Sequence, residues 1–364
     1  MFKGFILVGL SVFAASALTL TVAFAEETEY FGARPDAVGP IGGGKGYTRI
    51  VTKGDFTVKT ETELVDALKN AKPGQVVYVD DGAELDFTVR VRAQQFVLEL
   101  PGGVTLASGR GNKGSQGAVI CSDEFATSPL IKITGPKARI TGIRLRGPDP
   151  KMRWDELPRL LTLGGQELYY KFPTSDGVWC PFPDAEVDNC EISGWSHGGV
   201  FVQKGGDNAH IHHNFIHHCQ RRGLGYGVSL DQSHALIERN IFDYCRHSIA
   251  ATGYPGTAYE AHDNIVQNNA ILPSFDMHGG VDRGDGTSIA GDWLKIHHNT
   301  FLGKWKDIDF VPAAGIRGIP TEGADIHHNR FGREDPKKAN YLGVPSDKIR
   351  IYRNQYGPKK EIKD

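Results

Sequence analysis

The stretch IHHNFI, residues 211–216, is one copy of a pattern that recurs through the second half of the chain. Each copy has an aliphatic residue, two variable residues, an asparagine, and two further residues of which the second is apolar or aromatic. Clear copies begin at Ile237, Ile296, Ile326 and Ile351, and weaker copies begin at Val187 and Ala261. The shared residues are Asn214, Asn240, Asn264, Asn299, Asn329 and Asn354, at intervals of 26, 24, 35, 30 and 25 residues. A period in the mid-twenties that is stretched by insertions is typical of a solenoid.

The repeat unit contains short alternating apolar runs and no helical stretch, which predicts a coil of β-strands rather than a pair of helices. One coil cannot bury its own apolar face. Coils stacked about 4.8 Å apart form a continuous core and align equivalent residues in columns. We therefore predict an all-β solenoid of the parallel β-helix type. The asparagine column, in which Cys190 replaces asparagine in the copy VDNCEI, is interpreted as a structural ladder of side-chain amides that bond from coil to coil.

Residues 60–82, TETELVDALKNAKPGQVVYVDDG, predict a short amphipathic helix followed by a strand. Leu64, Ala67 and Leu68 share one helix face, and the helical pattern ends at Lys-Pro-Gly. Such a helix would cap the open end of the solenoid. The stretch resembles the start of right-handed β-helix enzymes of the pectin-lyase-like superfamily, notably the chondroitinase B and alginate lyase group. The resemblance implies a right-handed parallel β-helix with an N-terminal capping helix.

The N-terminus has the charged, apolar and small-residue parts of a secretory signal peptide. We expect a signal peptide over 1–25, an extension over 26–55 and the β-helix domain over 56–364. The protein would then be secreted or periplasmic, with no membrane segment after cleavage. The formal charge of −2 and the mixing of lysines with aspartates argue against nucleic acid as a partner.

Two His-Gly-Gly-Val elements contain His197 and His278. A count of seven residues past the ladder positions gives His197, Arg221 and His247, and alignment of the two elements adds His278 at the same level. Stacked cationic or titratable groups on consecutive coils repel one another unless an anion lies against them. We therefore predict a substrate groove along this column. The glycines after the histidines are expected to let a ligand or a neighbouring backbone approach closely.

The predicted column suits β-elimination from a uronate. In this reaction a base removes a proton, a cation stabilises the carboxylate, and an acid protonates the departing oxygen. Histidine suits the base because much of it is neutral near pH 7. We assign the base to His247 or His278, the neutralising charge to Arg221 or Arg246, and the proton donor to Tyr226 or Tyr259. The main prediction is therefore a polysaccharide lyase, and β-helix lyases of the alginate and chondroitin type, which the chain resembles, pair a basic residue with an arginine.

Insertions over 252–260 and 282–292 interrupt the ladder beside the predicted column, and insertions in a solenoid usually carry the binding face. A further insertion, 145–160, contains a tryptophan that suits a sugar platform and a structural anchor equally well. The substrate-binding residues that we predict are Lys204, Arg222, Glu260, Asp282, Arg283 and Trp154. We expect a monomer whose partner is a polysaccharide, of acidic type because the column is basic.

Three alternatives to a lyase stay open. FDMHG, residues 275–279, resembles the FDPHD-type motif of β-helix mannuronan epimerases, with Asp276 and His278 at its acid and histidine positions and with departures at Met277 and Gly279. Hydrolysis of the polygalacturonase type needs two carboxylates, which folding could bring together. A non-catalytic β-helix that binds glycans, as in tail-spike and adhesin proteins, is the third.

No cofactor is predicted with certainty. His247, Asp276 and His278 are of metal-ligand type and could meet on adjacent coils. Calcium, which many β-helix lyases use, prefers carboxylate and carbonyl oxygens, and the sequence has no dense acidic cluster for it, so calcium stays an open possibility. The histidine pairs at 212–213, 297–298 and 327–328 are interpreted as surface stacks.

The five cysteines are given a structural interpretation. Cys219 and Cys245 both lie five residues after their ladder positions, so we expect them on neighbouring coils within bridging reach. Cys180 and Cys190 flank a short segment and could close a local loop. Cys121 is then left unpaired.

Overall fold

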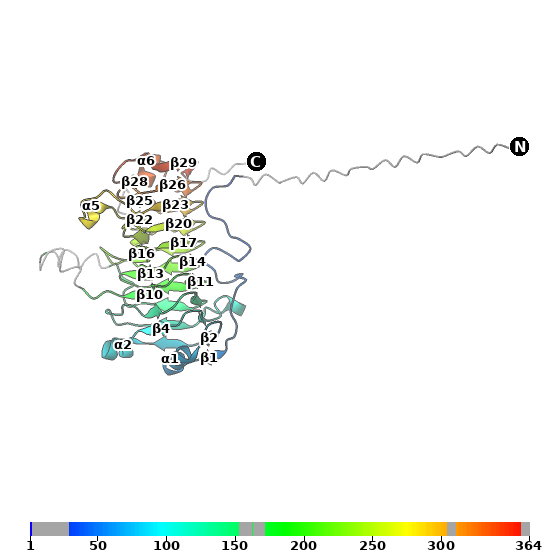
Figure 1. Ribbon diagram of the computed structural model, residues 1–364. Coiled ribbons are helices and arrows are strands. Elements are labelled where there is room, and N and C mark those ends of the chain that lie inside the picture. Colours follow the sequence, from blue (N-terminus) through cyan, green and yellow to red (C-terminus); the bar gives the residue numbers. More distant parts are fainter. Residues whose placement is uncertain (2–28, 153–161, 163–171, 304–310, 358–364) are drawn as a thin grey trace. The chain divides into compact units, whose positions relative to one another are not determined.

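The strands of this chain form three parallel sheets, to which successive coils of a solenoid contribute one strand after another (Figure 1). A computed structural model of the chain describes residues 29–152, 172–303 and 311–357, together with Met1 and Thr162. The described residues from Phe31 onward make up one compact unit. Apart from Met1, the expected signal peptide, 1–25, lies outside the described residues. The parallel β-helix predicted from the asparagine repeat is confirmed.

We call the three sheets A, B and C. Sheet A contains, in hydrogen-bonded order, β1 (Phe56–Val58), β2 (Val76–Val79), β5 (Thr105–Ala107), β8 (Arg139–Thr141), β11 (Glu186–Asp188), β14 (Ala209–His212), β17 (His234–Glu238), β20 (Ala258–His262), β23 (Trp293–His297), β26 (Gly323–His327) and β29 (Ile349–Tyr352). Sheet B contains β3 (Glu84–Asp86), β6 (Val119–Cys121), β9 (Arg144–Arg146), β12 (Glu191–Ser193), β15 (Phe215–His217), β18 (Ile241–Asp243), β21 (Ile265–Val266), β24 (Thr300–Phe301), β27 (Arg330–Phe331) and β30 (Gln355–Tyr356).

Sheet C contains β28 (Asn340–Leu342), β25 (Ala314–Ile316), β22 (Phe275–Met277), β19 (His247–Ala251), β16 (Tyr226–Leu230), β13 (Gly198–Val202), β10 (Asp176–Cys180), β7 (Ile131–Ile133) and β4 (Leu98–Leu100). The helices among the described residues are α1 (Glu61–Asn70), α2 (Thr88–Gln94), the short 3-10 helix η1 (Asn112–Gly114), α5 (Gly280–Arg283) and α6 (Pro336–Ala339). None of these helices combines the length and apolar character needed to cross a membrane.

The core consists of apolar columns that run from coil to coil. In sheet A, Val187, Ile211 and Ile237 are register partners and fully buried, so the residues on either side of each face outward. In sheet B, the rings of Phe331 and Tyr356 stack with centroids 5.2 Å apart. Each coil therefore buries the apolar face of the next. Because of this packing, strands that would be too short to be stable alone form here.

The asparagine ladder is present as predicted. Asn240 Oδ1 accepts from the backbone N–H of Asn214 at 3.0 Å, and its Nδ2 donates to Ile211 O at 2.8 Å and to Asn264 Oδ1 at 3.1 Å. At Cys190 the backbone N–H donates to Asn214 Oδ1. The residues before the ladder positions have positive φ, namely Asn189, His213, Arg239, Asp263, His298, His328 and Arg353. This left-handed turn costs on the order of 1 kcal/mol per residue, and the ladder bonds offset the cost.

The N-terminal capping helix is also confirmed. Helix α1 begins after Thr60, which forms a capping box with Glu63, and it buries Leu64, Ala67 and Leu68. It packs against β1, β2 and β4, at the N-terminal end of the solenoid (Figure 1). The end of the core is thereby covered by an apolar helix face.

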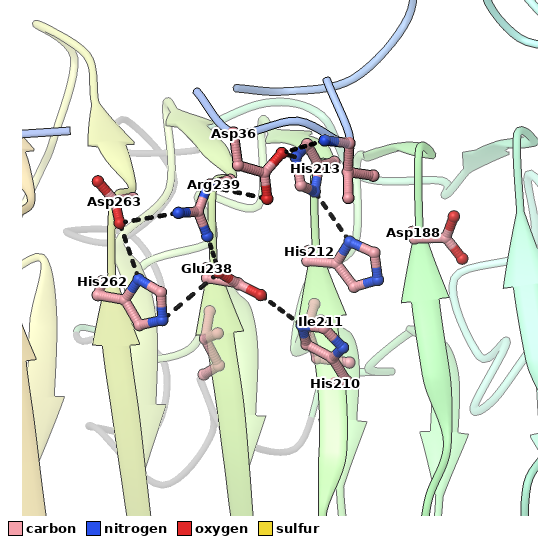
Figure 2. Close-up of polar contacts among 12 residues, drawn as sticks. Asp36, Asp188, His210, Ile211, His212, His213, Glu238, Arg239, His262 and Asp263 are labelled. Atoms are coloured by element: carbon pink, nitrogen blue, oxygen red, sulfur yellow. Dashed lines mark hydrogen bonds and ion pairs between the residues drawn. The ribbon is translucent and has the colours of Figure 1, made fainter. Parts of the chain in front are cut away.

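Residues 31–55 run along the outside of the solenoid from its C-terminal coils toward its N-terminal coils. Gly32 N donates to His328 O at 2.9 Å, and Tyr47 Oη donates to Asp188 Oδ2 at 2.7 Å. Between these points Asp36 lies over His213, with its Oδ1 3.2 Å from Nε2 (Figure 2). The expectation of surface stacks is therefore wrong for the pair 212–213, whose residues are 2% and 1% exposed.

All five cysteines are buried free thiols, so neither expected disulfide is formed. Cys219 and Cys245 do stack on neighbouring coils, where their thiols are in contact. Burial raises the pKa of the Cys180 and Cys190 thiols to about 12. Thiolates are the species that start disulfide exchange, and the apolar core disfavours them.

Candidate functional site

The predicted column of His197, Arg221, His247 and His278 does not exist as one level of the solenoid. Gly198, Tyr226 and His247 are the residues in register at the starts of β13, β16 and β19. His197 lies one residue before that level. His278 lies at the other end of the sheet C strands, since it follows Met277, the register partner of Ala251. A fixed count from the ladder fails because the loops that lead into sheet C differ in length.

Sheet C nevertheless brings polar side chains together at the starts of β13, β16 and β19. We call Asp176, His197, Tyr226 and Arg246 the His197 site. His197 Nδ1 lies 2.7 Å from Asp176 Oδ1, and its ring packs edge-on against the Tyr226 ring with centroids 5.5 Å apart. The Arg246 guanidinium lies 5.9 Å from the centre of the same tyrosine ring. Three consecutive coils thus supply an imidazole, a phenol and a guanidinium.

The Asp176 carboxylate fixes the orientation of the histidine. Asp176 is 2% exposed and also accepts from Ser128 Oγ at 2.7 Å. The His197 side chain is 25% exposed, so the ring reaches solvent while its carboxylate partner does not. When Nδ1–H is donated to Asp176, Nε2 carries the lone pair and can accept a proton. This arrangement is chemically that of an oriented general base.

A second group, which we call the Asp276 cluster, comprises His247, Asp276, His278 and Arg317. Phe275 and Met277 on either side of Asp276 are in the core, so its carboxylate projects from the opposite face of β22. Arg317 binds it with two nitrogens, Nε to Oδ1 at 3.0 Å and Nη2 to Oδ2 at 2.7 Å. His278 Nε2 lies 3.0 Å and His247 Nε2 lies 3.7 Å from Oδ2.

The electrostatics of the cluster keep Asp276 ionised and His247 neutral. Burial of the carboxyl opposes its ionisation, but the adjoining His247, His278 and Arg317 hold the pKa of Asp276 well below its usual range. Burial lowers the pKa of His247 to about 3, and its Nδ1 lies 2.5 Å from the carbonyl oxygen of Pro273. The rings of Tyr226 and His247 have centroids 5.8 Å apart, so the two groups adjoin. His247 is fully buried, which leaves His278 as the more exposed histidine of the cluster.

The assignment of Arg221 as the neutralising charge is wrong for this structure. Arg221 is 4% exposed, its Nε donates to Asp149 Oδ2 at 2.8 Å, and its Nη1 donates to Pro173 O at 2.6 Å. Its charge is already paired with a buried carboxylate. Arg246, the other arginine proposed for this role, lies in the His197 site.

Two further predicted residues lie away from sheet C. Tyr259 is fully buried in β20 with its side chain in the core, so it cannot protonate a substrate. Glu260 faces outward from sheet A, where its carboxylate contacts His297 Nε2 at 3.1 Å and Lys295 Nζ at 3.3 Å. The reason is the alternation within β20, which points adjacent side chains to opposite faces.

The remaining binding residues are mostly structural or peripheral. Arg283 is an anchor of its loop, donating to Thr252 O and Ile289 O at 3.0 Å each. Asp282 lies beside the Asp276 cluster, with its Oδ1 3.3 Å from Arg317 Nη1. Lys204 and Arg222 are exposed in loops that follow β13 and precede β16. Trp154 lies outside the described residues.

The glycines of the two His-Gly-Gly elements are required by backbone packing. A Cβ at Gly199 would lie 2.8 Å from the carbonyl oxygen of Gly227 on the next coil. A Cβ at Gly279 would lie 2.4 Å from the carbonyl oxygen of Arg317. Of the two predicted reasons for these glycines, close approach of a neighbouring backbone is therefore the one that the structure supports.

Sequence reasoning missed Asp176 and Arg317, although both follow from strand register. Asp176 is the register partner of Gly198, one coil earlier. Arg317 follows Ile316, the partner of Met277, and so occupies the position of His278 on the next coil. Aligning MHG with IRG would have found it.

Comparisons with known proteins agree with this fold. Residues 173–331 match the family model described as a right handed beta helix region. An alginate lyase from Paenibacillus sp. has a similar structure, at 16% identity over 83% of this chain and 95% of that chain, with a TM-score of 0.59. A family 28 exopolygalacturonase from Yersinia enterocolitica matches at 12% identity over 84% of this chain and 62% of that chain, with a TM-score of 0.41. No curated protein matches. The fold of this chain is therefore a parallel β-helix, and its residues 173–331 are similar to right-handed β-helix regions.

Proposed function

We propose that this chain is an exported polysaccharide-active enzyme that cleaves a uronate-containing polysaccharide by β-elimination at the His197 site. The main support for this proposal is the 2.7 Å contact between His197 and Asp176, next to Tyr226 and Arg246. His197 would remove the proton beside the uronate carboxylate. Arg246 would stabilise the charge that develops there, and Tyr226 would protonate the departing oxygen.

The state of the carboxylates favours elimination over hydrolysis. A glycoside hydrolase needs one carboxyl group that stays protonated to act as the acid. Asp276 is held ionised by the adjoining Arg317 and histidines, and Asp176 is bound to His197 and Ser128. Neither carboxyl is thus placed to protonate a glycosidic oxygen. The buried Asp276 cluster would instead support the adjoining site by fixing His247 and Arg317.

The proposal is tested by incubating the purified protein with alginate, pectate, hyaluronan and a neutral glycan. Ultraviolet-absorbing unsaturated ends are expected from one of the acidic polymers. Reducing ends without absorbance would indicate a hydrolase, a changed uronate configuration without cleavage would indicate an epimerase, and retention on the polymer alone would indicate a binding protein.

The chain offers a matched pair of variants for this assay. His197→Ala should remove turnover, whereas His234→Ala should not. His234 is also paired with an aspartate, with Nδ1 3.0 Å from Asp207 Oδ1, but it lies on sheet A. Full activity of the His197 variant would overturn the assignment of the base.

A further inference from the structure

A second group of chemically active side chains lies on the outer face of sheet A. Glu186 on β11 is the register partner of His210 on β14, and His212 lies two residues further along the same strand. Since Val187 and Ile211 between them point into the core, all three side chains project outward. One nitrogen of each histidine and a carboxylate oxygen lie within 4.8 Å of one another.

We propose that Glu186, His210 and His212 form a binding site for a divalent transition-metal ion of the zinc type. Two imidazole nitrogens and one carboxylate oxygen are a ligand set that zinc accepts, with a water molecule in the fourth position. The three ligand atoms must move closer together to reach one ion. His212 Nε2 and Glu186 Oε1 are already 2.9 Å apart. This site is independent of the chemistry proposed at sheet C.

The surroundings orient His212 as a ligand. Its Nδ1 lies 2.9 Å from His213 Nδ1, and His213 Nε2 lies 3.2 Å from Asp36 Oδ1, as Figure 2 shows. With an ion in place of the proton between Nε2 and the Glu186 carboxylate, His212 keeps Nδ1–H to donate to His213, and such outer contacts raise affinity at known metal sites.

Two contacts must yield when the ion binds. Arg49 Nη1 lies 2.7 Å from Glu186 Oε1, and its side chain is 41% exposed, so it can move into solvent. His210 Nε2 lies 2.8 Å from Glu238 Oε1, visible in Figure 2, so the ring must release this carboxylate to bind the ion through that nitrogen. The Arg49 contact involves an exposed arginine, and such pairs are weak.

The later strands of sheet A that the structure describes have no histidine at the level of His210. Across the later strands of sheet A, the level of His210 is occupied by Leu236, Glu260, Lys295, Asp325 and Arg350. His210 and His212 are the only two histidines in the chain that are separated by a single residue. The later histidines of this face therefore lack a second histidine on the same strand.

The test is calorimetric titration of the chelator-treated full chain with zinc chloride. The wild type should bind one equivalent of zinc. His210→Ala and Glu186→Gln should each weaken binding by more than about tenfold, because changes to outer-sphere partners alone already weaken binding about tenfold or more at known sites. His297→Ala, which changes a histidine beside Glu260 on the same face, should bind like the wild type. Circular dichroism of each variant confirms that it folds.

A gain-of-site variant gives a second, independent result. Lys295→His places two histidines on β23 in the arrangement of His210 and His212, with Glu260 across on β20. It should raise the stoichiometry from one to two. Absence of saturable binding by the wild type, or equal weakening in the His210 and His297 variants, would overturn the site, and neither result bears on the activity proposed at sheet C.

Discussion

His197 Nδ1 lies 2.7 Å from Asp176 Oδ1, and the carboxylate is buried while the imidazole is not. If this pair orients a catalytic base, Asp176→Asn should lower kcat by about 10²- to 10⁴-fold because the amide stabilises the wrong tautomer. KM should change little. Steady-state kinetics on the polymer that is cleaved would measure this, with Ser128→Ala as a milder control. A fully active Asp176→Asn enzyme would exclude Asp176 as the residue that orients the base.

The Asp276 carboxylate is fully buried and is bound by two nitrogens of Arg317. Arg317→Gln removes the guanidinium and leaves a buried charge incompletely paired, so we expect a loss of about 3–5 kcal/mol in the free energy of unfolding. Urea denaturation measures it. Arg350→Gln breaks a pair with Asp325 in which the arginine is 66% exposed, and the free energy of unfolding should stay close to that of the wild type. Equal losses in the two variants would contradict the prediction.

The ladder residue Asn240 makes bonds to the coils on both sides. Asn240→Ala leaves several buried groups unsatisfied, including the Asn214 N–H and the Ile211 carbonyl, and should cost about 3 kcal/mol or more. Asn354, at the C-terminal end of the ladder, is partly exposed, and its alanine variant should cost about 1 kcal/mol. Thermal and urea unfolding of both variants would measure this difference in stability loss. Equal losses in the two variants would argue against a cooperative ladder.

We expect the stacked histidines to make the fold sensitive to acid. Burial is the main cause that lowers the pKa of His213, His298 and His327 to about 4. In the unfolded chain these residues take up protons near pH 6.5. The unfolded state therefore binds more protons between these values, so stability should be complete above pH 6.5 and fall progressively toward pH 4.

Urea midpoints measured across this interval would show the predicted slope. His298→Asn keeps a residue that tolerates the positive φ of 53° at this turn and removes one titrating ring, so it should flatten the curve. A midpoint that stays constant from pH 7 to pH 4 would show that the stacks do not control acid stability.

The sequence by itself determined the fold, because the information is local and repeated. Asn214, Asn240 and their equivalents mark one turn of every coil, and the alternating residues around them specify which side chains face the core. The capping helix was equally predictable, since Thr60 and Glu63 satisfy its first N–H groups without help from distant residues.

Only the tertiary structure decided which polar residues meet. Gly198, Tyr226 and His247 share a level although they follow Cys190, Asn214 and Asn240 by 8, 12 and 7 residues. Loop lengths on the way to sheet C vary because solvent-exposed loops tolerate insertions that the stacked strands do not. A count from the ladder therefore placed Arg221 in the site and missed Asp176 and Arg317. Pairing between coils sets those positions, and it depends on residues more than twenty positions apart.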